Sequence, residues 1–242
     1  MKSIRIYQDI NLSTECEITL DKSASNHLLR VLRLKESENF TLFNGDGYEY
    51  PATLSTNGKT AIAKISERIT MHNESPLHIH LFQGISKGDR MDFAIQKAVE
   101  LGVSHITPVF CARTVVNLKG DRLEKKRQHW QATVISACEQ SGRNRVPYVG
   151  EPCSLADSFT LNPDNLKILL DPTASIKLNS LSPDNHQLDI FIGPEGGFTD
   201  QEIQQARDNQ VNGVCFGPRI LRTETAALSA IAACQLLWGD LS

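Results

Sequence analysis

The chain has 242 residues, of which 40% are hydrophobic and 22% are charged, and its formal net charge is −3. This composition is typical of a globular protein, and a chain of this length buries roughly 70% of its unfolded surface without help from disulfides or metals. The slightly negative charge excludes a uniformly basic nucleic-acid-binding protein, so any such site must be a local patch.

Two further features bear on location. No run of about 18 apolar residues occurs, so we exclude a transmembrane helix, and the residues after Met1 lack the apolar core of a signal peptide. The six cysteines include no CxxC pair, and several lie in apolar runs, as Cys215 does between Val214 and Phe216. We therefore expect reduced, buried thiols in a cytoplasmic protein.

Residues 1–72 alternate between apolar and polar side chains over short stretches, which is typical of half-buried strands. The expected strands are 4–6, 17–20, 40–43 and 61–65. Asn-Gly turns at Asn44-Gly45 and Asn57-Gly58 favour hairpins, and one amphipathic helical stretch covers 25–32. This pattern predicts a small β-barrel, followed by a polar linker over 70–76.

From Leu77 onward, apolar strands alternate with helical stretches. The expected strands are 77–82, 105–110, 166–170, 188–192 and 213–216, and the expected helices are 89–101, 122–140, 199–209 and 224–237. Ser86 and Thr199 are each followed three residues later by an acid, as in a capping box, and Gly102 stands where a helix C-cap belongs. The alternation predicts an α/β fold in which helices cover both faces of a mostly parallel sheet.

Charge is distributed unevenly along the chain. Between Lys22 and Lys35 there are four basic residues and no acidic one, and between Arg113 and Arg145 there are eight basic residues against three acidic ones. Solvated helix faces explain most of these residues, but they explain Arg143 and Arg145 less well, because both lie in an expected loop. On charge alone, an RNA-contacting surface and a solvated helix surface are equal alternatives.

Residues 189–228 contain the most informative pattern. The apolar strand 189–192 runs into a glycine-rich turn, Gly193–Phe198, and a second strand runs into Gly217 and the charged segment Arg222-Thr223-Glu224. Both turns lie at the carboxyl ends of strands, which is where ligands bind in α/β sheets. Glycines at these positions allow the backbone to approach a ligand closely.

The first turn, Gly-Pro-Glu-Gly-Gly, lacks the lysine of a P-loop and does not match the GxGxxG motif of dinucleotide-binding proteins. Glu195 would repel a phosphate, so a cationic or neutral polar ligand suits the turn better, although a structural glutamate explains it equally well. The last helix, 224–237, is apolar nearly all round, which predicts burial in the core or at a subunit contact. That burial leaves the charged residues at its start unexplained.

Five motifs follow one another along both halves of the chain. They are His27-Leu-Leu-Arg-Val-Leu-Arg33, Lys97-Ala-Val-Glu-Leu-Gly-Val103, Ala137-Cys-Glu-Gln-Ser-Gly-Arg143 with Pro147, Gly193-Pro-Glu-Gly-Gly-Phe-Thr-x-x-Glu202 and Leu221-Arg-Thr-Glu-Thr-Ala226. Together they resemble the RsmE family of ribosomal RNA uridine-N3 methyltransferases. The resemblance implies a PUA-like β-barrel RNA-binding domain over 1–72, a SPOUT methyltransferase domain with a deep trefoil knot over 73–242, and a homodimer.

The same resemblance implies that S-adenosylmethionine is the cofactor and that the substrate is 16S ribosomal RNA of the small subunit, methylated at N3 of one uridine. The pocket it implies lies between the loops after strands 166–170, 188–192 and 213–216. We expect cofactor contacts from Leu170, Ile192, Gly193, Glu195, Gly197, Phe216, Gly217, Ile220, Leu221 and Arg222. We expect phosphate contacts that position the RNA from Arg5, Arg30, Arg33, Arg113, Arg143 and Arg145.

The imide nitrogen of uridine holds a proton at neutral pH, so its methylation requires that this proton be removed or destabilised. We expect Arg222 to stabilise the developing anion electrostatically. Glu224 is a candidate base, although at a helix start its carboxylate can instead serve only as a cap, and Glu139 is a second candidate. His78 and His80 would share one strand face, but no carboxylate or cysteine completes a ligand set, so we expect no metal site.

Three other functions remain open on the sequence alone. A related knotted methyltransferase could act on a ribose hydroxyl or on transfer RNA, which identification of the methylated nucleoside would reveal. A catalytically silent RNA-binding or ribosome-assembly factor would fail to bind S-adenosylmethionine. A small-molecule enzyme using the same loops would turn over without RNA.

Overall fold

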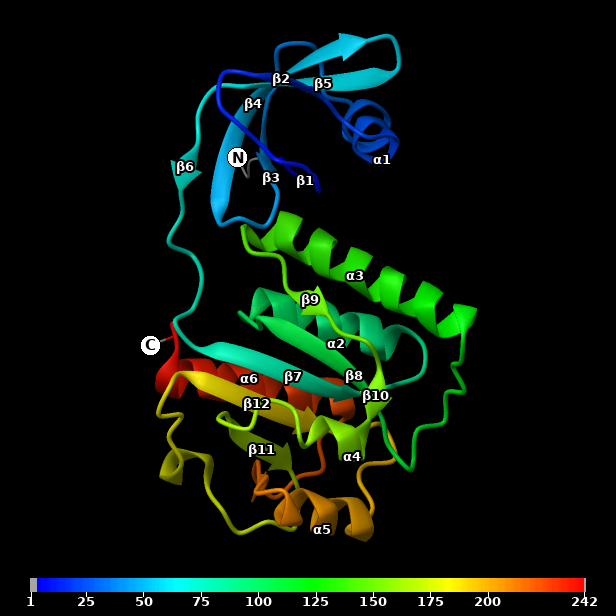
Figure 1. The fold of residues 1–242 in the computed structure, drawn as a ribbon, viewed down its shortest axis with the longest axis vertical. Coiled ribbons are helices and arrows are strands. Elements are labelled where there is room, and N and C mark those ends of the chain that lie inside the picture. Colours follow the sequence, from blue (N-terminus) through cyan, green and yellow to red (C-terminus); the bar gives the residue numbers. More distant parts are fainter. Residues whose placement is uncertain (1–3, 242) are drawn as a thin grey trace. The chain divides into compact units, whose positions relative to one another are not determined.

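Residues 4–241 are described in the computed structural model of the chain, and they are organised around two separate β-sheets (Figure 1). The first of two structural units contains the residues up to Glu74 together with Cys138–Val146, and the second contains Ser75–Ala137 and the residues from Pro147 onward. The sequence predicted a boundary after residue 72. Nothing in it indicated that Cys138–Val146 would group with the N-terminal strands.

The sheet of the first unit has six strands in the order β1-β3-β4-β5-β2, and β6 pairs with β4 outside this path. Its strands are β1 (Arg5–Tyr7), β2 (Glu17–Thr19), β3 (Asn39–Phe43), β4 (Tyr48–Asn57), β5 (Thr60–Ile65) and β6 (Ile69–Thr70). β1 and β3 are parallel, and the other pairs are antiparallel. Gly58 closes the β4–β5 hairpin with φ +64°, as the Asn-Gly turn predicted. β4 itself was not among the predicted strands.

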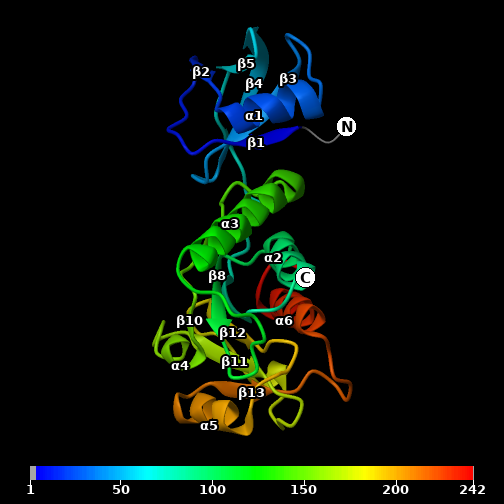
Figure 2. The ribbon, with the colours of Figure 1, turned by 90° about the vertical axis from the view of Figure 1, so that its right-hand side faces the viewer.

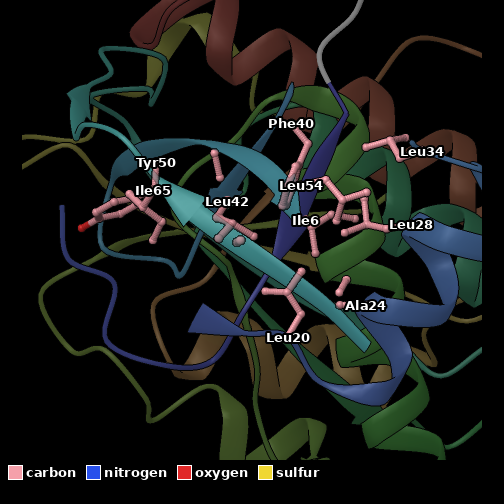
Figure 3. Packing of buried hydrophobic residues seen from close by; sticks show 13 residues of the cluster. Ile6, Leu20, Ala24, Leu28, Leu34, Phe40, Leu42, Tyr50, Leu54 and Ile65 are labelled. Atoms are coloured by element: carbon pink, nitrogen blue, oxygen red, sulfur yellow. The ribbon is translucent and has the colours of Figure 1, made fainter. Parts of the chain in front are cut away.

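The predicted helix over 25–32 consists of two pieces, α1 (Lys22–Asn26) and the π-helix η1 (His27–Val31). Asp21 caps α1 by accepting a hydrogen bond from the Ala24 N–H at 2.9 Å. Figure 3 shows how side chains from this segment and from the strands pack together. This core contains Ile6, Leu20, Ala24, Leu28, Leu34, Phe40, Leu42, Tyr50, Ala52, Leu54, Ala61, Ala63 and Ile65.

The sheet of the second unit is parallel throughout, with the order β10-β8-β7-β12-β11-β13, and β9 pairs with β8. Its strands are β7 (His78–Gly84), β8 (His105–Phe110), β9 (Tyr148–Val149), β10 (Cys153–Ser154), β11 (Leu166–Leu170), β12 (Gln187–Ile192) and β13 (Asn212–Val214). Five of these are the predicted strands. The two-residue strands β9 and β10 are too short to give a periodic signal.

Helices cover both faces of this sheet. They are α2 (Asp89–Glu100), α3 (Asp121–Ser141), α4 (Leu155–Ser158), α5 (Asp200–Asp208) and α6 (Thr223–Trp238), with a short 3₁₀ turn η2 (Leu178–Ser180). Figure 2 shows α2 and α6 together on one side of the sheet. On the other face Phe82 and Phe191 stack at 4.5 Å between ring centroids and pack with Phe159 beside α4 and Ala206 of α5. The predicted fold class is therefore confirmed, while the trefoil knot stays a prediction.

Capping follows the prediction at one helix and departs from it at another. Thr199 and Glu202 form a reciprocal capping box at the start of α5, as predicted. The capping box predicted at Ser86 and Asp89 is wrong, because the N-cap of α2 is Gly88, with φ +65°. The chain enters α2 through a positive φ angle at Gly88, which glycine favours, so Ser86 is not at the N-cap position. Its hydroxyl donates instead to the Gly84 carbonyl at 3.2 Å.

A buried polar cluster joins β7, β8 and β12. Asn162 lies within 3.0 Å of His80 Nδ1 and donates to the Asp189 carboxylate at 3.2 Å, and His80 Nε2 lies 2.8 Å from Thr107 Oγ1. Burial, with a smaller effect of neighbouring His105, lowers the pKa of His80 to about 3. Burial also raises the pKa of Asp189 to about 6, against the opposing effect of its hydrogen bonds.

Acidification should act on this cluster in two opposing directions. Below pH 6.5 the unfolded chain protonates His80 while the folded chain does not, so His80 lowers the free energy of unfolding by about 2 kcal/mol at pH 5. Asp189 binds a proton near pH 6 in the folded state but only near pH 3.8 in the unfolded state. Protonation of Asp189 therefore raises the free energy of unfolding by about 1 kcal/mol at pH 5. We expect Asp189→Asn, which cannot titrate, to lose more stability than wild type between pH 7 and pH 5 in urea unfolding. Equal losses would contradict this.

All six cysteines are free thiols, and Cys111, Cys138 and Cys234 are buried. Burial raises the pKa of both Cys138 and Cys234 to about 12. Within residues 4–241, no helix is long and apolar enough to cross a membrane. The same residues contain no group of three or more His, Cys, Asp or Glu side chains that could hold a metal ion.

Candidate functional site

A cavity of about 560 Å³ opens at the carboxyl ends of β11, β12 and β13, against the start of α6. Its walls come from the loops that follow these three strands. All ten residues predicted to contact a cofactor line it: Leu170, Ile192, Gly193, Glu195, Gly197, Phe216, Gly217, Ile220, Leu221 and Arg222. The two glycine-bearing turns, 24 residues apart in the sequence between Gly193 and Gly217, therefore form one site.

The first turn, Gly193–Phe198, is held by close backbone packing. A Cβ atom added to Gly84, the last residue of β7, would lie 2.5 Å from the Pro194 nitrogen and 2.7 Å from the Gly193 carbonyl carbon. Gly197 has φ +68° and donates its N–H to the Pro194 carbonyl at 2.9 Å. Glycine at both positions lets the turn fold tightly against the end of the sheet.

The second turn presents charge and an apolar side chain at the cavity. Gly217 has φ +75°, and Arg219, Ile220 and Arg222 are all exposed, Ile220 by 88%. Arg222 is the N-cap residue of α6, but its side chain makes no capping hydrogen bond. Its guanidinium is therefore available to a ligand without loss to the helix.

Glu224 supplies a carboxylate to the cavity. Its Oε2 is buried and has no hydrogen-bond partner within residues 4–241. An unpaired buried carboxylate oxygen is unfavourable unless a donor or a cation reaches it. The sequence left open whether Glu224 serves only as a helix cap, and this unpartnered oxygen favours the alternative, a ligand-facing group.

Glu195, in contrast, is engaged by neighbouring residues. Its Oε1 accepts hydrogen bonds from the Lys87 N–H at 2.9 Å and from Arg90 Nη1 at 3.1 Å. Burial raises the pKa of Glu195, but hydrogen bonds from backbone N–H groups and from Arg90 outweigh it, so the pKa lies below its ordinary value. Glu195 thus joins the first turn to the start of α2. Because its charge is already paired, Glu224 is the better candidate to face a cationic ligand.

Asp171 is a third acidic residue of the cavity, and sequence reasoning missed it. It follows the last residue of β11 and is 2% exposed. Its Oδ1 accepts hydrogen bonds from the Thr173 N–H and hydroxyl, while Oδ2 has no hydrogen-bond partner in the described chain and lies 3.7 Å from Arg207. Its position directly after a buried strand, as with the glycine turns, was the available signal.

Glu139, the second candidate base, belongs to the first unit and does not line the cavity. It accepts a hydrogen bond from the Tyr7 N–H at 3.0 Å. Burial raises the pKa of Glu139, partly offset by this hydrogen bond and by nearby His27 and Arg5. Its role in the structure is to satisfy the backbone of β1.

Two of the six arginines predicted to contact RNA are buried in the first unit. Arg5 pairs with Glu49 and also donates to the Arg143 carbonyl at 3.1 Å. Arg143 donates to Glu74 at 2.6 and 3.0 Å. Both side chains are about 8% exposed, so the structure gives them a structural role that their charge alone did not reveal.

The other four arginines are exposed. Arg30 and Arg33 lie in and just after η1, and Arg33 has φ +56°. The Arg145 side chain lies against Gly47. Arg113, in the second unit, lines the cavity and donates from Nη1 to the Gly196 and Phe198 carbonyls at 2.9 and 3.0 Å, which holds the first turn in place.

The residues present fit S-adenosylmethionine, which carries a sulfonium, an ammonium and an adenine ring. Within residues 4–241 no hydrogen-bond donor reaches Glu224 Oε2, so it can accept a hydrogen bond from a ligand or face its positive charge. Asp171 Oδ2 also lacks a donor in this part of the chain, but it lies 3.7 Å from Arg207. Ile192, Ile220 and Leu221 supply apolar walls. A cavity of this size with a few polar groups among apolar walls is typical of a cofactor site.

Comparison with known proteins agrees with this geometry. An RNA methyltransferase domain model matches residues 73–235, and an RNA methyltransferase PUA domain model matches residues 20–66. The chain is 38% identical to ribosomal RNA small subunit methyltransferase E of Buchnera aphidicola over 98% of each chain. The resemblance inferred from the five motifs is confirmed.

Two solved structures are similar over nearly the whole chain. One is ribosomal RNA small subunit methyltransferase E from Neisseria gonorrhoeae bound to S-adenosyl methionine, with a TM-score of 0.93, 44% identity and coverage of 99% of this chain and 100% of that one. The other is a Legionella pneumophila protein with bound cofactor SAM, with a TM-score of 0.96, 38% identity and full coverage of both chains. The chain belongs to the ribosomal RNA small subunit methyltransferase E family.

Proposed function

We propose that this protein transfers a methyl group from S-adenosylmethionine to N3 of a uridine in 16S ribosomal RNA of the small ribosomal subunit. The cavity between the two glycine-bearing turns carries the proposal, because it is lined by every predicted cofactor residue and by Glu224, whose Oε2 has no hydrogen-bond partner within residues 4–241. Relatives at 38% and 44% identity that cover nearly the whole chain bind this cofactor. We assign the methyltransferase domain to 73–242 and an RNA-binding domain to 1–72.

When bound, S-adenosylmethionine supplies a methyl group that is already activated by its sulfonium. The residues of this chain must therefore orient the uracil and deal with its N3 proton. We assign the role of accepting that proton to Glu224, which lines the cavity, and we assign to the Arg222 guanidinium the stabilisation of the negative charge that spreads onto the uracil oxygens. Holding both reactants in one geometry contributes several kcal/mol more.

Backbone groups and apolar walls would hold the cofactor. Gly193, Gly197 and Gly217 would let the two turns approach it closely, and Ile220 and Leu221 would supply apolar surface for its adenine ring. Leu170, Ile192 and Phe216 close the sides of the cavity, while Glu195 acts indirectly through Arg90 and α2.

RNA binding is assigned to the exposed arginines of the first unit, Arg30, Arg33 and Arg145. Each phosphate that a cation contacts releases counterions, so log K falls linearly with log salt. We expect Arg30→Ala and Arg33→Ala each to reduce the slope by up to about 1, measured by fluorescence anisotropy on a 16S fragment. Lys64→Ala is the matched control, because Lys64 is exposed but already paired with Glu17. Affinity that does not change with salt would contradict this assignment.

We further propose that the protein is a homodimer in the cytoplasm, where its ribosomal substrate is assembled. The packed helices α2 and α6 expose Phe93, Leu236 and Leu237, which are 45%, 58% and 46% exposed. Large apolar side chains that are exposed on a packed helix pair are typical of a subunit contact.

One experiment tests the proposed function directly. Small subunits from a strain that lacks the enzyme are incubated with the purified protein and labelled S-adenosylmethionine, and the modified nucleoside is identified by mass spectrometry. We expect 3-methyluridine in 16S ribosomal RNA. A ribose-methylated nucleoside, or label in transfer RNA alone, would overturn the substrate assignment. Absence of cofactor binding in calorimetry would overturn the enzyme assignment.

A further inference from the structure

Gln83 is a buried polar residue near the end of β7 that the proposed chemistry does not use. Its side chain is fully buried. Its amide Nε2 donates to the Gly84 carbonyl at 3.2 Å and to Thr223 Oγ1 at 2.9 Å, while its Oε1 has no hydrogen-bond partner within residues 4–241. A buried amide with one unpaired end stabilises a fold poorly, since an apolar side chain of similar size would avoid that loss. The contact with Thr223 therefore needs another explanation.

Thr223 links this amide to the cavity. Its hydroxyl has a single proton, which it donates to the Gly193 carbonyl at 2.6 Å. Because it accepts from Gln83 at the same time, the direction of both hydrogen bonds is fixed. Two hydrogen bonds in series polarise one another in a buried setting, and Thr223 is only 6% exposed.

These two hydrogen bonds connect three segments that are far apart in the sequence. Gln83 and Thr223 are 140 residues apart, and Thr223 and Gly193 are 30 apart. Gly193 opens the first turn of the cavity, and Thr223 stands between Arg222 and Glu224 at the start of α6. The Thr223 hydroxyl thus fixes the first turn relative to Arg222 and Glu224, the two side chains assigned to the uridine.

We propose that Gln83 and Thr223 are positioning residues, whose hydrogen-bond chain holds the Gly193 turn in register with Arg222 and Glu224; the assignment rests on the proposed use of S-adenosylmethionine in this cavity. Gln83 orients the hydroxyl, and the hydroxyl orients the Gly193 peptide. Neither side chain need touch the reacting atoms.

Thr223→Val tests this assignment, because valine keeps the shape of threonine and removes only the hydroxyl. We expect S-adenosylmethionine affinity in calorimetry to fall by about tenfold, the loss that one hydrogen bond produces, and kcat on small subunits to fall further. Thr223→Ser should restore both to within about threefold of wild type, since it keeps the donor. Thr133→Val is the matched control, because the Thr133 hydroxyl donates to the His129 carbonyl of its own helix, away from the cavity.

Gln83→Leu separates positioning from stability. It should leave the thermal unfolding temperature close to that of wild type, yet weaken cofactor binding, because the Thr223 hydroxyl is then free to rotate. The double variant Q83L/T223V should bind no worse than T223V alone, since both changes break one chain. Losses that simply add would overturn the proposal, as would a serine variant no better than valine.

The two levels of failure can be told apart. If the wild-type protein does not bind S-adenosylmethionine, the proposed function fails and this assignment fails with it. If wild type binds and T223V binds and turns over equally well, only the positioning assignment fails. Should T223V not fold, Q83L and T223S carry the same comparison.

Discussion

Arg222→Ala is expected to lower kcat on small ribosomal subunits by about 10²–10³, the loss typical when one preorganised donor to a developing anion is removed. Arg222 lines the cavity and is exposed, and its side chain makes no capping hydrogen bond to α6. The substitution therefore removes charge from the site without removing a helix cap. Single-turnover methylation with saturating S-adenosylmethionine measures the effect on the chemical step.

The design separates catalysis from binding and folding. Calorimetry should show S-adenosylmethionine affinity within a few-fold of wild type, because the proposed cofactor contacts are chiefly with backbone and apolar groups. Arg222→Lys should fall between wild type and alanine, since lysine keeps the charge but not the planar fork. Arg122→Ala removes an exposed cation at the start of α3 and serves as the charge control. A folded Arg222→Ala variant with full turnover would remove Arg222 from the mechanism.

Gly84→Ala is expected to disrupt the cofactor site more than any other single-methyl change. The added Cβ would lie 2.5 Å from the Pro194 nitrogen and 2.7 Å from the Gly193 carbonyl carbon. Both are backbone atoms that cannot rotate away, so the turn must shift off the sheet. Overpacking of this kind costs about 1–3 kcal/mol, and we expect S-adenosylmethionine affinity to fall by more than tenfold.

Gly213→Ala is the matched control for this substitution. It also adds one methyl group to a strand of the same sheet, but the added Cβ would lie at ordinary contact distance from its neighbours, 3.4 Å from Ala174 Cβ and 3.6 Å from Asp171 Oδ2. Thermal unfolding and calorimetry on both variants should show a loss only for Gly84→Ala. Equal behaviour would mean that the contact between β7 and the first turn is not what holds the cavity.

Local pattern was enough to predict most elements of the second unit. β8 (His105–Phe110) and β11 (Leu166–Leu170) have the predicted bounds. The ends of the other predicted strands and helices of this unit differ from the structure by at most two residues. These elements are readable because apolar periodicity, glycine and capping residues act over a few neighbours. The same holds for the two glycine-bearing turns that line the cavity, since parallel strands place their carboxyl ends at one edge of the sheet.

Roles that depend on a distant partner could not be read in this way. Arg143 looks like a surface cation in the sequence, but Glu74 lies 69 residues away and pairs with it in a buried position. Likewise, the sequence favours Glu195 as a ligand-binding group, whereas in the structure its Oε1 already accepts hydrogen bonds from Arg90 and the Lys87 N–H. A charge has the same sequence pattern whether it is solvated or paired, so burial decides its role.

By itself, the sequence determined the fold class, the two glycine-bearing turns and the family, because each depends on short-range patterns or on motifs in a fixed order. The tertiary structure alone decided which oxygen atoms at the cavity lack a hydrogen-bond donor within residues 4–241, namely Glu224 Oε2 and Asp171 Oδ2, and which polar groups are already satisfied. It also decided that Gln83 reaches Thr223 across 140 residues. Hydrogen bonds and ion pairs need contact within about 3–4 Å, and only the folded chain brings such groups that close.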